Sequence, residues 1–550
     1  MSGPLLIVGV DGLPPALLQR LIDDGRSPHL ARLARDGSCG TLRSTPNYQS
    51  ASAWTSLVTG VNPGKHGVLH FTNPVGGSYD LAQIDARARR APTIWRMLSD
   101  AGVRVAALNV PVSYPAEPVE GVMVAGWLCP SPGAEGFTHP ADLAAWLRAE
   151  FGDYPIHPDV RRHATAGRYD VVAEVARAGV EVKLEAARRI FQRERPDVLC
   201  VVLTETDSLQ HWCWHLLDAR HPTYEERAAR SWEEELLSVY VALDRGLGRL
   251  LAATGEDTDL LVVSDHGQAP NSGGQILLRP WLIHRGYLVA RSSSPFRRAA
   301  DAVVRRSFEG LRRRAGKRMK AGLRARFPGL QGRAQASVRG IEPDWPRTRA
   351  WTETGQIFLN TRGRWPKGCV EPGCERERLL DELREGLLGL REAQSGERAV
   401  ARVALGDEQF AGAHAGLMPD LLVHWRNDLS IQALIDSDGS TILRHDAPEL
   451  PTGAHHPDGT LLTSGPSFRT AESADEHSIY DVAPTLLHLL GMAVPSYLDG
   501  RVMVDLLSED AAKEVRTAAV NIDPAASDRS SRADGEEVIR RRLRSLGYLE

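Results

Sequence analysis

The sequence predicts an α/β fold, a three-layer α/β/α sandwich around a mostly parallel sheet with inserted cap segments. Two observations lead to this expectation. Short, continuous apolar runs alternate with amphipathic helical stretches over the first half of the chain, which is typical of strands buried on both faces of a covered sheet. The length of 550 residues exceeds what one small core needs, so we expect a large domain with insertions, or two to three domains.

The apolar runs and the helical periodicity place the elements in chain order. In the first half, strands are expected at Leu5–Val10, Val103–Asn109, Gly121–Ala125, Asp197–Leu203 and Leu260–Ser264. Helices are expected at Pro14–Asp36 with a break at Gly25–Pro28, and at Ala53–Thr59, Val180–Arg193 and Glu233–Thr254. In the second half, we expect strands at Gln356–Asn360, Asp420–His424 and Leu461–Gly465, and helices at Arg376–Leu390 and Ile479–Leu490.

Composition divides the chain into four segments. Residues 1–285 are predicted to form the first part of the core, and 346–508 its second part with a small cap. Between them, 286–345 is a basic, helical insertion that includes Arg312–Arg314. Such a helix can lie on an anionic membrane, although a solvated lid or an oligomer contact is the preferred interpretation. Residues 509–550 read as a flexible linker and a C-terminal helix.

Charge and cysteine content narrow the class of protein. The formal net charge is -4, from 66 basic and 70 acidic side chains, so nothing points to specific nucleic-acid binding. The apolar start of the chain lacks a basic segment and ends at Asp11, so we read it as a buried strand and not as a signal peptide. Six cysteines without CxxC spacing are typical of a reducing compartment, and we expect a cytoplasmic protein. The nearby Cys369 and Cys374 are a weak candidate for a disulfide or a metal site.

Acidic and imidazole side chains follow several predicted strands. Since the carboxyl ends of parallel strands meet at one edge of a sheet, these side chains are expected to lie together. Carboxylate and imidazole ligands suit Zn²⁺, and two ions need roughly six or seven protein ligands. Any one of these residues taken alone is better explained as a helix cap or a surface histidine. The candidates are Asp11, Asp207, His211, Asp265, His266 and His455, with His456 beside the last.

Several hydroxyls crowd the start of the predicted helix at Ala53–Thr59. The amino end of a helix favours an anion, which suits a nucleophile that attacks phosphorus. Ser50 is the candidate nucleophile, but Ser50 or Ser52 can equally cap the helix, and position alone does not decide between these interpretations.

These motifs, in this order and spacing, resemble the type I phosphodiesterase/nucleotide pyrophosphatase family of the alkaline phosphatase superfamily. The resemblance covers most of the chain, and it implies an alkaline-phosphatase-like fold. The segments that carry it are VDGL, SASAWTSLVTGVNPGKHGV, TETDSLQH, VVSDHG, FLNTRGRWPKGCV, GAHHPDG and IYDVAPTLLHLLGM.

The resemblance implies two metal sites and a covalent mechanism. One site would use Asp207, His211 and His455, with His456 as the rival for the last position. The other would use the remaining candidates, namely Asp11, Asp265, His266 and the hydroxyl of Ser50. Zn²⁺ is the expected ion, with Mn²⁺ as the alternative. The implied reaction is an in-line attack by the serine, followed by hydrolysis of a phospho-serine intermediate.

The chain departs from the family pattern at several positions. Ser50 stands where many members have threonine, and Phe71 lies near the place where nucleotide pyrophosphatases have an asparagine that contacts the phosphoryl oxygen. Asn73 is the candidate to replace that contact. Trp212 is a candidate to stack on the substrate, with packing around the metal site as the alternative. Ser52 and Trp54 occupy the proline and arginine positions of the sulfatase motif, which argues against a sulfatase.

We therefore expect a hydrolase that cleaves phosphodiester or nucleotide pyrophosphate bonds of a small-molecule phosphate ester. A phosphomonoesterase or phosphomutase of the same superfamily is the alternative, and Lys65, Arg364 or the basic insertion are candidates to grip a dianionic phosphate. A membrane-associated phospholipid headgroup enzyme, with peripheral contact through the basic insertion, is a further alternative. A non-catalytic relic is disfavoured because every expected ligand position is retained. The sequence leaves the oligomeric state open.

Overall fold

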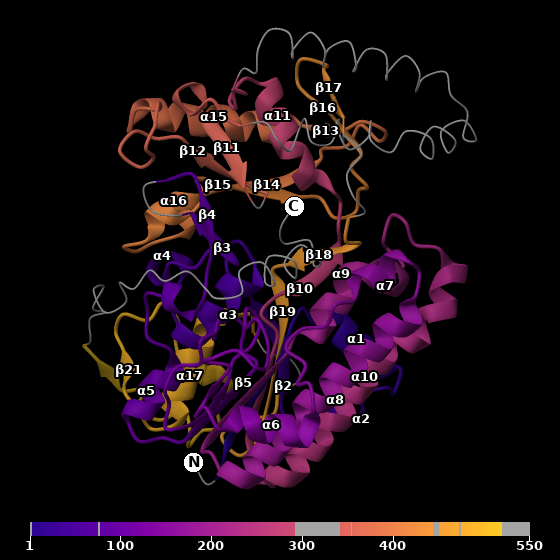
Figure 1. Ribbon diagram of the computed structural model, residues 1–550, viewed down its shortest axis with the longest axis vertical. Coiled ribbons are helices and arrows are strands. Elements are labelled where there is room, and N and C mark those ends of the chain that lie inside the picture. The colour runs from indigo at the N-terminus through magenta and orange to yellow at the C-terminus, as the bar shows by residue number, and fades with distance from the viewer. Residues whose placement is uncertain are drawn as a thin grey trace.

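The computed structural model describes residues 3–74, 78–291, 342–353, 355–443, 450–471 and 475–519. These residues form a large α/β core with a smaller cap above it (Figure 1). The predicted 286–345 insertion lies mostly outside the described residues, and so does most of 509–550. No helix within the described ranges combines the length and the apolar character needed to cross a bilayer.

The largest sheet of the described chain runs in the order β20-β2-β19-β9-β1-β8-β5-β6-β7. Its five central strands are parallel: β9 (Asp259–Val263), β1 (Leu5–Val10), β8 (Val198–Leu203), β5 (Val105–Leu108) and β6 (Gly121–Val124). They are almost entirely buried apolar residues, as expected for strands covered on both faces. The remaining strands are β19 (Asp458–Ser464), antiparallel to β9, then β2 (Ser38–Arg43), β20 (His477–Ser478) and β7 (Thr138–His139).

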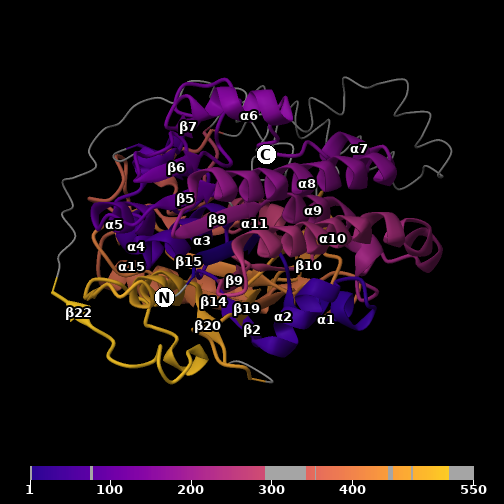
Figure 2. The same ribbon diagram turned by 90° about the horizontal axis from the view of Figure 1, so that it is seen from below.

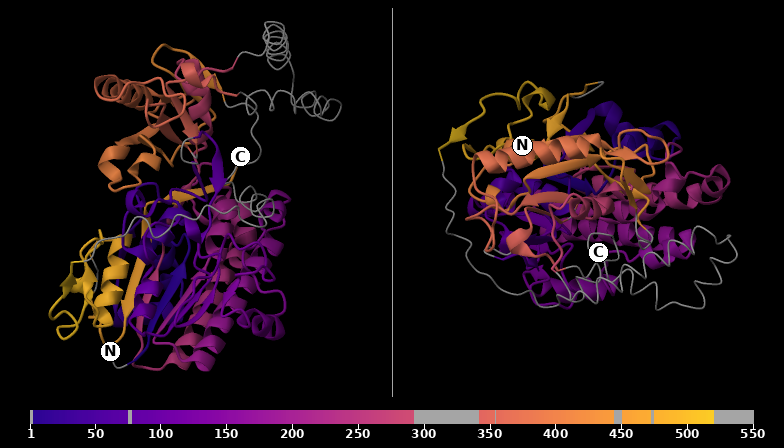
Figure 3. Two further views of the ribbon diagram at one scale, coloured as in Figure 1. Left: turned by 60° about the vertical axis from the view of Figure 1, so that its left-hand side comes forward. Right: turned by 90° about the horizontal axis from the view of Figure 1, so that it is seen from above.

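Helices cover both faces of this sheet, which confirms the predicted three-layer fold (Figures 2 and 3). One face carries α1 (Pro15–Asp23), α2 (Pro28–Asp36), α6 (Leu143–Phe151), α7 (Arg161–Thr165), α8 (Tyr169–Glu194), α9 (Glu205–Leu217) and α10 (Glu226–Thr254). The other carries α3 (Ser50–Thr59), α5 (Ile94–Asp100) and α17 (Val482–Leu489). Prolines in the first turn start both α1 and α2, which explains the predicted break between them.

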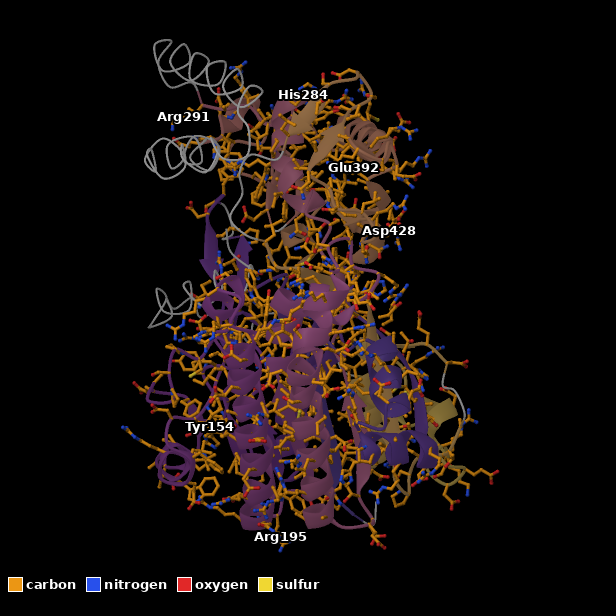
Figure 4. All side chains as sticks on the ribbon, turned by 90° about the vertical axis from the view of Figure 1, so that its right-hand side faces the viewer. Tyr154, Arg195, His284, Arg291, Glu392 and Asp428 are labelled. Atoms are coloured by element: carbon orange, nitrogen blue, oxygen red, sulfur yellow. The ribbon has the colours of Figure 1, made fainter. Side chains whose placement is uncertain are left out.

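The cap is an insertion between β9 and β19 with an apolar core of its own. Figure 4 shows it as the upper lobe with His284 and Glu392, while Tyr154 and Arg195 lie on the core below. Its antiparallel sheet is β11 (Ala350–Glu353), β12 (Gln356–Leu359), β15 (Leu421–Trp425) and β14 (Val400–Leu405). It also contains α11 (Leu278–His284), α15 (Cys374–Gly389), α16 (Gly406–Gln409), β13 (Arg391–Glu392), β16 (Ala433–Ile435) and β17 (Thr441–Leu443).

The chain enters and leaves the cap through a pair of adjacent strands, β10 (Gly267–Pro270) and β18 (Gly453–His456), which pair antiparallel. The hairpin of β3 (Thr72–Pro74) and β4 (Leu81–Gln83) rises from the core toward the cap (Figure 1). Tyr79, in the turn before β4, stacks on Trp345 of the cap, with ring centroids 3.6 Å apart. The remaining short elements are α4 (Pro63–His66), β21 (Val494–Pro495) and β22 (Thr517–Ala518).

Two helices are longer than the sequence predicts. The structure begins α8 at Tyr169 and α10 at Glu226, whereas the apolar periodicity indicated starts at Val180 and Glu233. The first turns of α10 are largely exposed, so they carry little apolar signal. The strand β2 was not anticipated, because only two of its six residues are fully buried.

Candidate metal centre

The predicted ligands meet at the carboxyl edge of the parallel strands. Asp11 directly follows β1, and Asp207 lies in the first turn of α9 after β8. Asp265 and His266 follow β9. His455 lies on β18, which leads into β19, and an antiparallel strand begins at the edge where its parallel neighbours end.

A first cluster consists of Asp207, His211 and His455. The distance from His211 Nε2 to Asp207 Oδ1 is 3.3 Å, and from His455 Nε2 to the same oxygen 3.5 Å. The two Nε2 atoms are 3.0 Å apart. His211 and Asp207 are spaced i,i+4, so one face of α9 presents both.

A second cluster consists of Asp11, Asp265, His266 and Ser50. His266 Nε2 lies 3.5 Å from Asp11 Oδ1, 3.4 Å from Asp265 Oδ2 and 3.0 Å from Ser50 Oγ. The rings of His266 and His455 stack with centroids 3.7 Å apart. The two clusters are therefore immediate neighbours.

All three imidazoles are oriented in the same way by backbone carbonyls. His211 Nδ1 lies 3.1 Å from the carbonyl oxygen of Gly453, and His266 Nδ1 lies 2.9 Å from that of Gly267. His455 Nδ1 lies 2.9 Å from the carbonyl oxygen of Tyr48. A carbonyl can only accept, so each Nδ1 carries the proton and each Nε2 presents a lone pair to its cluster.

Burial and mutual repulsion perturb the pKa values of the carboxyl groups. Burial and the neighbouring Asp265 and Asp207 raise the pKa of Asp11 well above its usual range. Burial and Asp207 raise the pKa of Asp265 to about 7. For Asp207, burial acts upward, but the adjacent histidines, His211 first, bring its pKa below the ordinary value.

These residues fit a cation. Asp11 Oδ1 and Asp265 Oδ2 are buried and have no hydrogen-bond partner among the described residues. Buried carboxylates without partners are costly unless a positive charge neutralises them. Oxygen and imidazole donors at this spacing suit Zn²⁺, and both the Asp11, Asp265, His266 group and the Asp207, His266, His455 group have metal-ligand spacing.

Ser50 is the first residue of α3, and its side chain is fully buried. Its hydroxyl faces the second cluster through the contact with His266 described above. Ser52 braces the start of the helix instead, because its Oγ lies 3.0 Å from Asn47 Oδ1 and 2.9 Å from the carbonyl oxygen of Gln49. Of the two serines, only Ser50 is thus in position to act at the cluster.

The family model described as type I phosphodiesterase/nucleotide pyrophosphatase matches residues 5–335. The chain belongs to this family. It is a phosphodiesterase/pyrophosphatase-type hydrolase of the alkaline phosphatase superfamily, and the family is metal-dependent. No curated protein sequence matches the chain.

Solved structures are similar to the chain at low sequence identity. Phosphonoacetate hydrolase from Sinorhizobium meliloti 1021, solved with phosphonoformate and with phosphonoacetate, is 17% identical with a TM-score of 0.50. That alignment covers 88% of this chain and 94% of the hydrolase. Murine ectonucleotide pyrophosphatase/phosphodiesterase 5 is 13% identical with a TM-score of 0.49, and the alignment covers 92% of this chain and all of the murine chain.

The two candidate substrate contacts of this family member are engaged elsewhere. Asn73 Nδ2 donates to the carbonyl oxygen of Gly67 at 2.6 Å, and its Oδ1 accepts from the Leu69 amide at 3.1 Å. Trp212 is buried in the main core, with the guanidinium of Arg161 5.3 Å above its ring. Both residues shape the structure here, and their contact with substrate stays a prediction.

His456, the rival of His455, points away from the clusters. Its Nδ1 lies 3.6 Å from Asp458 Oδ2, and 38% of its side chain is exposed. His70, in contrast, is buried close enough to His455 that burial and that imidazole together lower its pKa to about 3. It stays a neutral group beside the first cluster.

Two residues that orient the ligands were not predicted from the sequence. Trp54 Nε1 donates to Asp11 Oδ2 at 3.0 Å, from one turn beyond Ser50 on α3. Tyr48 supplies the carbonyl that fixes His455. Trp54 lies in the motif that marks the family, so its spacing from Ser50 was an available signal. The contact made by the Tyr48 backbone carbonyl leaves no such signal in the sequence.

Proposed function

We propose that this hydrolase cleaves a phosphodiester or nucleotide pyrophosphate bond of a small-molecule phosphate ester at a two-metal site, with Ser50 as the nucleophile. One observation carries the proposal. The seven residues predicted from the sequence converge on two adjacent buried clusters. The serine hydroxyl lies 3.0 Å from Nε2 of His266, whose ring stacks on that of His455 in the neighbouring cluster.

Each cluster would hold one divalent ion, Zn²⁺ in the first instance and Mn²⁺ as the alternative. Asp207, His211 and His455 would hold one, and Asp11, Asp265 and His266 the other, with the Ser50 hydroxyl beside it. When bound, such ions supply Lewis acidity that stabilises negative charge on phosphoryl oxygens and lowers the pKa of a nearby hydroxyl.

The residues of the chain arrange the reaction around Ser50. Its oxygen would form a bond to phosphorus while the bond from phosphorus to the leaving oxygen breaks, which leaves a phospho-serine for water to hydrolyse. The hydroxyl stands at the amino end of a ten-residue helix, where the helix dipole favours the anionic phosphoryl group. Water exclusion by the buried surroundings strengthens these interactions.

The two candidate cations for a monoester among the described residues, Lys65 and Arg364, are occupied, which favours a diester. Lys65 Nζ lies 2.6 Å from Asp499 Oδ1 and 2.7 Å from the carbonyl oxygen of Tyr497. Arg364 is bound to Asp420 at 2.7 Å. Neither is left to grip the extra charge of a phosphate monoester.

The decisive comparison is hydrolysis of bis-p-nitrophenyl phosphate and p-nitrophenyl phosphate by zinc-loaded protein. We expect faster turnover of the diester, no detectable turnover by Ser50→Ala, and dependence on added metal. Phosphonoacetate, the ligand of the structural relative, is included as a third substrate. A faster monoester would replace the proposal with a phosphatase or mutase, and no turnover of any substrate with Zn²⁺ or Mn²⁺ would refute it.

A further inference from the structure

A pair of cap residues faces the core close to the metal ligands. Arg402 on β14 and His424 on β15 are directly paired across the two strands, so their side chains lie on the same face of the cap sheet. His424 Nδ1 lies 2.8 Å from the hydroxyl of Tyr48, and the two rings are 5.5 Å apart. This contact identifies the face that is turned toward the core.

Tyr48 joins this pair to the first cluster. Its carbonyl oxygen orients His455, and its side chain reaches the cap. Its φ angle of 34° is unusual for a bulky residue, so the surrounding contacts must hold the backbone in place. Only one residue, Tyr48, therefore separates His424 from a metal ligand.

The charges of the pair suit an anion. Arg402 is exposed, and no described residue forms an ion pair or hydrogen bond with its side chain. Several other arginines of the cap are paired with carboxylates, for example Arg376 with Asp407 and Asp420, and Arg426 with Glu397 and Asp428. An unpaired guanidinium beside a phosphate-ester site has a fork of donors that matches a carboxylate or phosphate.

His424 adds a neutral donor. Burial, and then the charge of Arg402, lower its pKa to about 4. The tyrosine hydroxyl lies 2.8 Å from His424 Nδ1 and can donate a hydrogen bond to it. The imidazole proton then resides on Nε2, where it is available to a ligand.

We propose that Arg402 and His424 form a subsite on the cap that binds a second anionic group of the substrate, a carboxylate or phosphate, beyond the phosphoryl group that reacts. This inference rests on the proposed function and narrows it: the substrate carries negative charge at two places. The Tyr48 bridge sets the subsite beside the first cluster.

The test compares three 4-nitrophenyl phosphodiesters whose second ester group is phenyl, 4-carboxyphenyl or 4-phosphonophenyl. Their Kd values are measured by calorimetry with the zinc-loaded Ser50→Ala protein, which cannot turn them over. We expect the charged esters to bind roughly 10- to 100-fold more tightly than the phenyl ester. The carboxylate and phosphonate arms show which anion the subsite prefers.

Adding Arg402→Gln to the Ser50→Ala protein should abolish the tighter binding of the charged esters. Adding Arg426→Gln, a matched substitution of a paired cap arginine, should preserve it. Equal Kd values for all three esters, or a preference that survives Arg402→Gln, would overturn the subsite. Failure of the hydrolase proposal has a different signature, because wild-type protein would then bind the esters without releasing 4-nitrophenol.

Discussion

Single residues outside the candidate ligand set orient the side chains of the proposed metal site. Trp54 donates to one carboxylate oxygen of Asp11, which leaves the other oxygen directed at His266. Backbone carbonyls accept from Nδ1 of the three histidines, which directs each Nε2 at its cluster. Such outer contacts fix the orientation of ligands, and they are worth a large part of the affinity.

Trp54→Phe should weaken metal binding, because Asp11 loses the donor that orients it. We expect roughly 10- to 100-fold weaker affinity, measured by competition with a chromogenic chelator. Trp95→Phe is the matched control, since Trp95 is buried in the same apolar cluster and its indole nitrogen has no hydrogen-bond partner among the described residues. Equal effects of the two substitutions would show that packing, and not the Asp11 contact, is responsible.

The two serines at the start of α3 should separate chemistry from stability. Ser50→Ala should abolish diester turnover while the protein stays folded, because the hydroxyl faces His266. Ser52→Ala should retain turnover and lower the free energy of unfolding by about 1 kcal/mol, the usual cost of a lost hydrogen bond. Turnover by Ser50→Ala near the wild-type rate would remove the serine from its proposed role.

Among the elements, α8 and α9 are joined by a fully buried ion pair. Lys183 Nζ lies 2.7 Å from Glu205 Oε1, and neither side chain is exposed to solvent. Gly179 makes room for it, since a Cβ there would lie 2.6 Å from the same oxygen. Glu205 is two residues before Asp207, so the pair helps to set the first turn of α9.

Lys183→Met should lower the free energy of unfolding by about 3–5 kcal/mol, because it leaves the Glu205 carboxylate buried without its partner. Denaturant unfolding measures this, and the double variant Lys183→Met/Glu205→Gln should recover part of the loss. Arg188→Met, which removes a partly exposed pair with Glu185 on the same helix, should cost about 1 kcal/mol or less. Similar losses for both single variants would contradict the role of burial.

The elements predicted from the sequence are those with continuous apolar runs. β1 is predicted to the residue, and β5, β6, β8 and β9 to within two residues at either end. The direction of β19 is not encoded in its own residues, because the path through the cap decides it. The candidate metal ligands could be selected from the sequence because each stands in a motif at or after a strand end. Tyr48 was not, because its role depends on a backbone carbonyl and on a cap residue, His424, that is 376 positions away.

For the whole molecule, the proposed metal centre draws on distant parts of the chain. Its residues come from α3, α9 and β18 and from the positions that directly follow β1 and β9, and the cap is inserted between β9 and β18. Burial, and then repulsion between the carboxylates, disfavours their charged forms in the folded state, as the raised pKa values of Asp11 and Asp265 indicate. Ions bound there should therefore stabilise the entire fold.

Adding Zn²⁺ to metal-stripped protein should raise Tm, which thermal denaturation measures. A ligand at about 100 times its Kd contributes about 2.7 kcal/mol for each site. Asp265→Asn should reduce the rise. The cap group of His284, Asp436 and Asp438 also has metal-ligand spacing, so Asp438→Asn is the control and should leave the rise unchanged. If Asp438→Asn reduced the rise and Asp265→Asn did not, the stabilising ion would be bound in the cap.

The central claim, two metal sites in adjacent clusters, is tested most directly by elemental analysis of protein equilibrated with Zn²⁺ and freed of excess ion. We expect about two ions per chain in the wild type and about one in each of Asp207→Asn and Asp265→Asn, because each substitution disables one cluster. A wild-type content of one ion or none, or a content that neither substitution changes, would contradict the two-metal account.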